Sequence, residues 1–223
     1  MDAASLNRSE LSAAVGDLGW RLILGDLCTQ VAAPSLRQAA ETAAALVALD
    51  GPAPTTDDQG QLQLDVRPDR LMITLAGVLR KGRASLASVD AARRVSVRLR
   101  ELGLTPEPAQ AQTAEIAIDA LDIPAVVPFW RAVFGYAHES PYAIVDPAGR
   151  GPSVWFQQMD APRPQRNRIH IDVTVPHDQA RVRLEAALAA GGKLVRDAEA
   201  PAFWVLADPE GNEACICTWQ ARD

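Results

Sequence analysis

One of the three histidines in the chain lies in a segment whose pattern predicts a β-strand. The segment RIHIDVTV, residues 168–175, alternates polar and apolar side chains, which is typical of a half-buried strand. An imidazole in such a position can ligate a metal or exchange protons near neutral pH. It can also be a hydrogen-bonded polar side chain within ordinary sheet packing. The pattern around His170 leaves these two interpretations open.

Two of the three cysteines lie on another predicted strand. Cys215 and Cys217 are two residues apart, so both side chains point to the same face of that strand. This is a poor arrangement for a disulfide between them, and three cysteines are too few for a disulfide framework. Free thiols fit a reducing compartment. We therefore expect three unpaired cysteines and a cytoplasmic location.

The composition is that of an ordinary globular protein and disfavours several classes of function. Of the 223 residues, 48% are hydrophobic and 22% are charged, and the net charge is −6. This charge disfavours general electrostatic binding to nucleic acid or to anionic membranes. No apolar run approaches the roughly 20 residues that span a bilayer, and the N-terminal residues lack an apolar signal core. We expect a small-molecule ligand and no nucleic-acid or membrane partner.

A segment rich in proline, glutamine and small residues divides the chain. The stretch LGLTPEPAQAQTAE follows a long helical pattern and precedes a new strand pattern, so residues 104–112 are predicted to be a linker. We therefore expect two domains of similar length, residues 1–103 and residues 113–223, in a protein of the α+β class.

The first half alternates helical and strand patterns. Ser9 is expected to cap a short helix, and apolar residues at three- and four-residue spacing predict two further helices. Two stretches, WRLILGDLCTQVAA and QLQLDVRPDRLMITLAG, alternate around turn residues and predict β-hairpins. The order αββαββα predicts a four-stranded antiparallel sheet with helices on one face.

This order, with Trp20 opening the first hairpin and the stretch DVRPDRLMITL in the second, resembles the pterin-4a-carbinolamine dehydratase family over roughly residues 8–103. Members of that family use histidines as general acid and base when water leaves a carbinolamine. The corresponding positions here fall near residues 60–62 and near Val78, and no histidine precedes residue 138. The resemblance therefore implies a degenerate domain without the catalytic histidines, which serves as a scaffold, a dimerisation unit or a small-ligand module.

The second half contains an internal repeat. The stretches AIVDPAGRGPSVWFQQ and WVLADPEGNEACICTW share a strand, an Asp-Pro-x-Gly turn and a second strand, and each follows a strand and a helix. A duplication of this kind predicts two similar modules packed side by side. Asp146 and Asp208, which open the two turns, are expected to have structural roles.

Four stretches in this half, FWRAVFGY, NRIHIDVTV, AALAAGGKLV and VLADPEGNEACI, are similar in order and spacing to the glyoxalase, bleomycin-resistance and extradiol-dioxygenase superfamily, which has the vicinal oxygen chelate fold. The resemblance covers about residues 113–220 and is strongest to the small glyoxalase-like branch. It implies two βαβββ modules that form a curved sheet around a cleft. Both family resemblances imply a homodimer.

The resemblance to the glyoxalase superfamily also implies a site in that cleft. The metal-ligating positions of the first strands fall at Glu115 and His170, and that of the last strand falls at Cys215. Carboxylate, imidazole and thiolate can all bind zinc, and the thiolate makes magnesium or manganese less suitable. Two of the three positions depart from the family's residue types, so we prefer a cleft without a metal ion to one that holds zinc. The ligand-binding residues expected in the cleft are Trp155, Gln157, His170, Phe203 and Trp204.

Three functions are compatible with this sequence. The first is an enzyme of the lyase or isomerase type that transforms a small organic molecule by proton transfer at a polarised carbonyl, with Glu115 as the base. The second is a binding or sequestration protein, like drug-binding members of the same superfamily. The third is a carbinolamine dehydratase in which aspartates, such as Asp57 and Asp58, replace the missing histidines. The sequence leaves open whether the protein is an enzyme.

Overall fold

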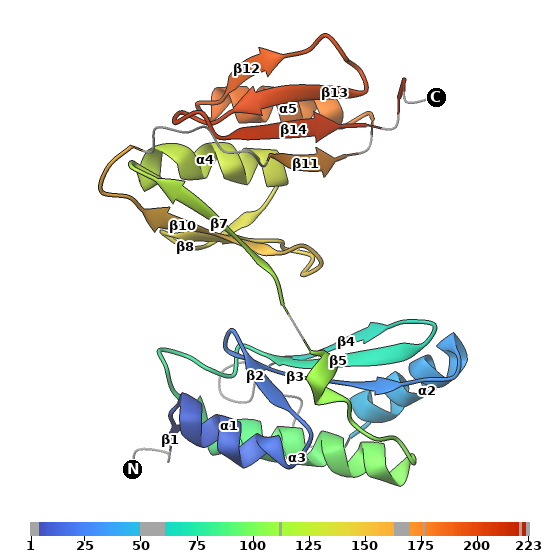
Figure 1. Ribbon diagram of the computed structural model, residues 1–223. Coiled ribbons are helices and arrows are strands. Elements are labelled where there is room, and N and C mark those ends of the chain that lie inside the picture. The colour runs from blue at the N-terminus through green and yellow to red at the C-terminus, as the bar shows by residue number, and fades with distance from the viewer. Residues whose placement is uncertain are drawn as a thin grey trace. The chain divides into compact units, whose positions relative to one another are not determined.

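The structure of the protein is a computed structural model that describes residues 5–49, 61–111, 113–162, 170–175, 177–218 and 220–221. The chain forms two compact units, Met1–Thr113 and Ala114–Asp223, and each contains helices and strands, so the mixed α+β class is confirmed (Figure 1). Asp57 and Asp58, the aspartates of the dehydratase hypothesis, lie outside the described residues. None of the described helices is long and apolar enough to cross a membrane.

The N-terminal unit is built on one antiparallel sheet with the strand order β2-β3-β5-β4. Both predicted hairpins are present, because β2 pairs with β3 and β4 pairs with β5. In the first hairpin, Leu24 and Gly25 both have positive φ, which the two-residue turns that match strand twist require. The strands of the sheet are β2 (Arg21–Ile23), β3 (Asp26–Ala32), β4 (Gln61–Val66) and β5 (Arg70–Ala76). A separate two-stranded pair consists of β1 (Ser5–Leu6) and β6 (Ala84–Ser85).

Three helices lie on one side of this sheet (Figure 1). The first begins earlier than predicted, since Asn7 and not Ser9 is its N-cap. The Asn7 side chain accepts a hydrogen bond from the backbone N–H of Glu10, and the Glu10 carboxylate accepts one from the backbone N–H of Asn7. This reciprocal pair satisfies two backbone donors and favours the earlier start. The helices are α1 (Arg8–Gly16), α2 (Leu36–Val47) and α3 (Leu86–Glu101).

The core of the N-terminal unit lies between these helices and the sheet. Alternate residues of the central strands, such as Leu27 and Ile73, point into it, because successive side chains of a strand face opposite sides. Trp20 is completely buried and donates its Nε1–H to the Ser96 hydroxyl of α3 at 2.8 Å. That hydroxyl donates in turn to the carbonyl oxygen of Leu18 at 2.8 Å. The two bonds satisfy the indole and fasten the start of the first hairpin to α3.

The segment predicted to be a linker packs against the N-terminal unit. Pro106 forms an isolated antiparallel bridge with Val31 of β3, and the backbone N–H of Glu107 donates to the carbonyl oxygen of Gln30 at 2.8 Å. Since β2 pairs only with the first residues of β3, these contacts occupy the part of the β3 edge that β2 leaves open. A short 3-10 helix, Pro108–Gln110, follows.

The C-terminal unit contains two four-stranded sheets, and both of its halves have the element order β-α-β-β-β. The strand orders are β7-β10-β9-β8 and β11-β14-β13-β12. In each sheet the first strand pairs in parallel with the last, and the other pairs are antiparallel. The first module consists of β7 (Glu115–Ala120), α4 (Ile123–Phe134), β8 (Ala137–Ser140), β9 (Ala143–Val145) and β10 (Ser153–Gln158). The second consists of β11 (Ile171–Thr174), α5 (Ala180–Ala189), β12 (Lys193–Arg196), β13 (Phe203–Ala207) and β14 (Glu213–Cys217).

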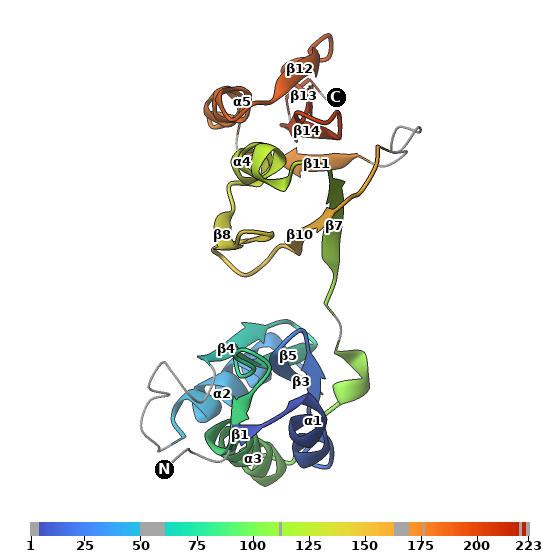
Figure 2. The ribbon, with the colours of Figure 1, turned by 90° about the vertical axis from the view of Figure 1, so that its left-hand side faces the viewer.

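Helices α4 and α5 lie side by side (Figure 2). The two modules also share one hydrophobic core. A buried carboxylate also connects the modules. Asp208, in the turn between β13 and β14, accepts a hydrogen bond from Nε1 of Trp130 in α4 at 3.0 Å. Asp208 also accepts hydrogen bonds from the backbone N–H groups of Glu210 and Asn212 and from the Asn212 side chain. The equivalent Asp146 accepts three backbone hydrogen bonds in its own turn. The structural roles predicted for both aspartates are confirmed.

Candidate functional site

The strand that follows His170 has one face in the core and one face in solvent. Ile171 and Val173 of β11 pack against the core, whereas His170 and Asp172 are exposed. This is the alternation that the sequence predicts for the described part of RIHIDVTV, whose first two residues lie outside the described chain. β11 pairs in parallel with β14 in a register that places Asp172 opposite Cys215.

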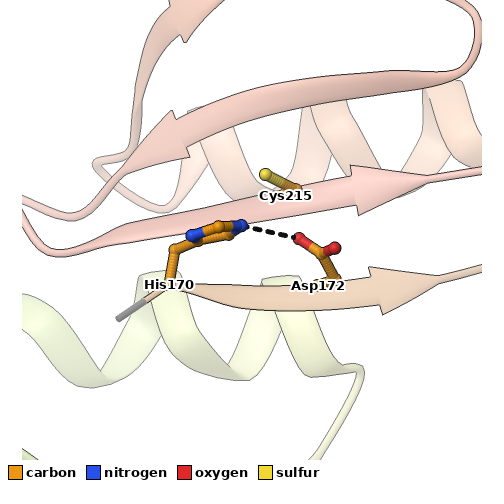
Figure 3. A group of neighbouring side chains, drawn as sticks. All are labelled: His170, Asp172 and Cys215. Atoms are coloured by element: carbon orange, nitrogen blue, oxygen red, sulfur yellow. Dashed lines mark ion pairs between the residues drawn. The ribbon is translucent and has the colours of Figure 1, made fainter. Parts of the chain in front are cut away.

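This register brings three chemically different side chains together, which we call the His-Asp-Cys group: His170, Asp172 and Cys215 (Figure 3). One ligand atom from each residue lies within 4.8 Å of the other two. Nε2 of His170 is 3.3 Å from Oδ1 of Asp172, and both of these side chains are 57% exposed. Cys215 is buried. The group therefore combines two solvent-facing polar side chains with a thiol that is held within the sheet.

The surroundings of Cys215 keep its thiol protonated near neutral pH. Burial, followed by the hydrogen bond and the negative charge of Asp172, raises the pKa of this thiol to about 12. Since the thiolate and not the thiol is the nucleophile, Cys215 is unsuited to nucleophilic catalysis near neutral pH. All three cysteines of the chain are free, as predicted.

A divalent metal ion fits the donor types of the His-Asp-Cys group. Imidazole, carboxylate and thiolate are all zinc ligands, and bond lengths of about 2.0–2.3 Å place the ligand atoms of a tetrahedral site about 3.3–3.8 Å apart. The three ligand atoms lie close enough together to reach such separations after small side-chain movements. The same side chains also offer hydrogen-bond donors and acceptors directly to a polar ligand.

Glu115 lies in the other sheet of the C-terminal unit. It begins β7, its side chain is exposed, and its Oε1 accepts a hydrogen bond from the Ser153 hydroxyl at 2.9 Å. Among the residues that the structure describes, Glu115 does not belong to the His-Asp-Cys group. Of the three predicted metal positions, the structure brings His170 and Cys215 together, and it places Asp172 beside them.

The other predicted ligand-binding residues divide between the two sheets. Trp155 and Gln157 lie on β10, on the face that points away from the core, and Trp155 is 38% exposed. In the second sheet, the register of β13 with β14 puts Phe203 on the same face as Cys215. Trp204 packs instead against the core, because adjacent residues of a strand face opposite sides.

Asp172 is the member of the group that the reasoning from the sequence missed. The sequence IHID does indicate this residue, because Asp172 comes two positions after His170 on a strand and therefore lies on the same face. Its approach to Cys215 depends on the pairing of β11 with β14, which joins segments that are far apart in the sequence.

The fold and the sequence together define the class of the C-terminal unit. Residues 115–217 match the family of the glyoxalase-like domain. The C-terminal half of this chain is therefore a glyoxalase-like domain of the vicinal oxygen chelate superfamily, as the sequence resemblance predicted. No curated protein matches the chain.

Several solved structures are similar to this half of the chain. A glyoxalase-related enzyme from Fulvimarina pelagi is 23% identical and covers 48% of this chain and 87% of its own, with a TM-score of 0.39. A glyoxalase/bleomycin resistance protein/dioxygenase family enzyme from Burkholderia phytofirmans PsJN is 20% identical, with coverage of 48% and 98% and a TM-score of 0.41. The fosfomycin resistance protein FosX from Mesorhizobium loti is 11% identical, with coverage of 48% and 90% and a TM-score of 0.38. Likenesses at this level carry no conclusion about activity.

Proposed function

We propose that the glyoxalase-like domain binds a small organic molecule on the face of its second sheet that carries the His-Asp-Cys group. The observation that supports this proposal is the convergence of an imidazole, a carboxylate and a thiol on β11 and β14, with two of the three open to solvent. The opposite face of β11 and β14 packs against the core, so the packing of the core does not account for these three polar side chains. Binding sites for small ligands typically combine apolar walls with a few convergent polar groups.

The proposed ligand has a carbonyl or hydroxyl group and a flat apolar part. His170 and Asp172 offer a hydrogen-bond donor and an acceptor for the polar end. Phe203, half-buried on the same face of the sheet, offers an aromatic surface for the apolar part. We include Trp155 and Gln157 in the proposed site, because the resemblance to the superfamily implies that both modules border one cleft.

Proton transfer of the lyase or isomerase type is the reaction that these groups support best. Glu115 is the proposed base, since its exposed carboxylate is oriented by the Ser153 hydroxyl. A divalent ion bound at the His-Asp-Cys group would polarise a carbonyl oxygen of the ligand. Binding without reaction, as in a sequestration protein, is the second candidate, and the position of Glu115 outside the group favours it.

A thermal-shift screen of the full chain against small carbonyl and hydroxyl compounds tests the binding proposal. A ligand at one hundred times its Kd stabilises the folded state by about 2.7 kcal/mol, which is a measurable shift. His170→Ala is expected to abolish the shift, whereas Val182→Ala, which changes an exposed residue of α5, leaves it unchanged. Equal shifts in both variants would place the ligand elsewhere and refute the proposed site.

Product analysis of the same hits distinguishes an enzyme from a binding protein. For an enzyme, Glu115→Gln is expected to keep the thermal shift and lose turnover, because the amide keeps the size of the side chain but cannot accept the proton. A wild-type chain that binds the ligand and leaves it unchanged supports sequestration.

For the N-terminal unit we propose a degenerate carbinolamine-dehydratase-like domain without catalytic activity. The order of its helices and hairpins and its antiparallel sheet support this proposal. The full chain is expected to dehydrate a carbinolamine only at the spontaneous rate. A faster rate that is lost in the double variant Asp57→Asn/Asp58→Asn would favour the third function, a dehydratase with replaced catalytic residues.

We also propose that the chain forms a homodimer, as both family resemblances imply. Sedimentation of the full chain at micromolar concentrations tests this, and a single monomeric species would refute it.

A further inference from the structure

We propose that residues 104–110 form a releasable strap, which docks on the N-terminal unit and thereby shortens the free chain that joins the two units. The strap follows α3 and includes the short 3-10 helix Pro108–Gln110. While the strap is docked, only residues 111–114 remain between that helix and β7. The inference is independent of the proposed function, because it concerns neither the His-Asp-Cys group nor an organic ligand.

A notch in the N-terminal unit receives the first proline of the strap. Gly19 follows α1 with a φ of +87°, a conformation that glycine adopts without strain. A Cβ atom added at this position would lie 2.6 Å from Cβ and 2.9 Å from Cγ of Pro106. The proline ring therefore occupies the space that a side chain at position 19 would need. Because this ring is closed onto its own backbone, it cannot rotate away, and a larger residue at position 19 would displace the strap.

Backbone pairing with β3 adds a second contact. The backbone N–H of Glu107 donates to the carbonyl oxygen of Gln30 at 2.8 Å, and Pro106 forms an antiparallel bridge with Val31. The hydrogen bond comes from the residue after the proline, so the missing N–H of Pro106 does not weaken the pairing. The strap is therefore held as a short extra strand at the edge of β3.

The charge of Glu107 adds a third contact. The pKa of the Arg70 guanidinium is raised, first by the hydrogen bond and the charge of Asp69 and to a smaller extent by the negative charge of Glu107. Arg70 begins β5, the other neighbour of β3. This attraction between exposed charges is screened by salt, so the docking of the strap is expected to weaken as the ionic strength rises.

The strap touches the N-terminal unit along one side, which makes it releasable. Half-buried and exposed residues alternate along it, with Leu104, Pro106 and Pro108 half-buried and Thr105, Glu107 and Ala109 exposed. Segments with little buried apolar surface and solvent-exposed backbone hydrogen bonds open at a lower free energy than the core of the same unit. The strap is therefore expected to detach while the sheet and the helices of the N-terminal unit remain folded.

Release of the strap changes the length of the free chain between the units. The four residues 111–114 reach at most about 14 Å when fully extended. Release adds the seven residues of the strap, and the eleven residues 104–114 reach at most about 40 Å. The strap therefore acts as a conformational device with a short and a long state of the connection.

Hydrogen exchange and small-angle X-ray scattering of the full chain test the two parts of the proposal. Hydrogen exchange measures the protection of the strap amides, and scattering measures the maximum dimension of the chain. In the wild-type protein we expect protected strap amides, and exchange that becomes faster when sodium chloride is raised from about 0.05 M to about 0.5 M. Glu107→Gln is expected to remove this salt dependence, because the amide carries no charge to attract Arg70.

Gly19→Ala is the variant that displaces the strap. It is expected to speed exchange of the strap amides at least about tenfold and to increase the maximum dimension by up to about 25 Å. The matched control is Gly82→Ala, since Gly82 also has a positive φ, of +78°, but a Cβ atom there meets nothing within 4 Å. The control therefore carries the same kind of backbone strain and is expected to leave the strap docked.

Pro106→Ala tests the same contact from the strap itself. It removes the ring from the notch without changing the N-terminal sheet or helices, so it keeps the test decisive even where Gly19→Ala does not fold. Circular dichroism establishes that each variant is folded. Faster exchange of the strap amides together with a larger maximum dimension in Pro106→Ala supports the proposal.

Three results would overturn the inference. The first is a wild-type strap whose amides exchange as fast as those of an unstructured peptide. The second is a folded Gly19→Ala variant, or a Pro106→Ala variant, whose strap exchanges no faster than that of Gly82→Ala. The third is faster exchange of the strap without an increase in the maximum dimension, because the strap would then not control the length of the connection.

Discussion

Replacing Asp208 by Asn is expected to destabilise the C-terminal unit strongly, although the two side chains have the same size. The carboxylate accepts four hydrogen bonds, two at each oxygen. Oδ1 accepts from the backbone N–H groups of Glu210 and Asn212, and Oδ2 accepts from Nε1 of Trp130 and Nδ2 of Asn212. Asparagine turns one of these oxygens into an N–H donor. In either orientation of the amide, two donors lose their acceptor and face another donor.

The expected loss in the free energy of unfolding follows from these contacts. A hydrogen bond to a charged group contributes about 1.5–3 kcal/mol, so the loss of two in a fully buried position costs about 3–6 kcal/mol. The matched control is Asp146→Asn in the equivalent turn of the first module, where the half-buried carboxylate accepts three backbone hydrogen bonds and is partly open to solvent. Water can replace a lost hydrogen-bond partner at this turn, so we expect Asp146→Asn to lower the free energy of unfolding by less than about 1.5 kcal/mol.

Hydrogen exchange followed by mass spectrometry through a urea series reports on the two units separately. With a urea dependence of about 1–3 kcal/mol per molar, a loss of 3 kcal/mol lowers the midpoint by about 1–3 M. The midpoints of α4 and β14 should fall together in Asp208→Asn, because the bond to Trp130 joins the two modules, while that of α3 stays unchanged. A loss of unfolding free energy no larger than that of Asp146→Asn would refute this reasoning. So would a fall in the urea midpoint that is confined to β14.

Three further predictions concern single residues. In the metal-free protein, the Cys215 thiol has a pKa of about 12, so only roughly one part in ten thousand of it is thiolate at pH 8. It should therefore resist alkylation by iodoacetamide unless the chain is unfolded, and peptide mass spectrometry can check this. Asp26→Asn should raise the thermal midpoint of the N-terminal unit at pH 7, because burial raises the pKa of this carboxyl and its ionisation therefore opposes folding. The gain in thermal midpoint should vanish as the pH falls through that pKa. A gain that persists in acid would contradict this origin. Gly192→Ala should destabilise the C-terminal unit by about 1–3 kcal/mol in urea unfolding, because the added methyl group would lie 2.6 Å from the Phe129 ring, whereas Gly16→Ala, which meets nothing within 4 Å, should cost nothing measurable.

Local patterns predicted much of the N-terminal fold. Alternation placed both hairpins, because a strand that packs on one face must alternate, and Gly25 marked the first turn. The helix start was predicted two residues late, since Asn7 forms a reciprocal pair with Glu10 that outweighs the capping tendency of Ser9. The position of Pro106 against β3 could not be predicted, because an irregular segment contains no periodic signal for the surface it covers.

The candidate site was predicted only in part, for a related reason. The alternation around His170 gives its face on β11, and the same rule applied to Asp172 would have placed this carboxylate on the same face. The register of β11 with β14, which brings Asp172 opposite Cys215, depends on the packing of a whole module. Trp204 shows the same limit, since its strand phase was not resolved and the structure turns it toward the core.

The segment that follows α3 also determines where the chain can be cut. A fragment that ends at Gly103 would lose the bridge between Pro106 and Val31 and the neighbouring backbone hydrogen bond, and part of the β3 edge would be left bare. Bare strand edges act as templates on which further chains assemble. A fragment extended to Ala111 keeps this edge covered. The N-terminal half is therefore best expressed alone with its proline-rich tail attached, and a shorter version is expected to aggregate.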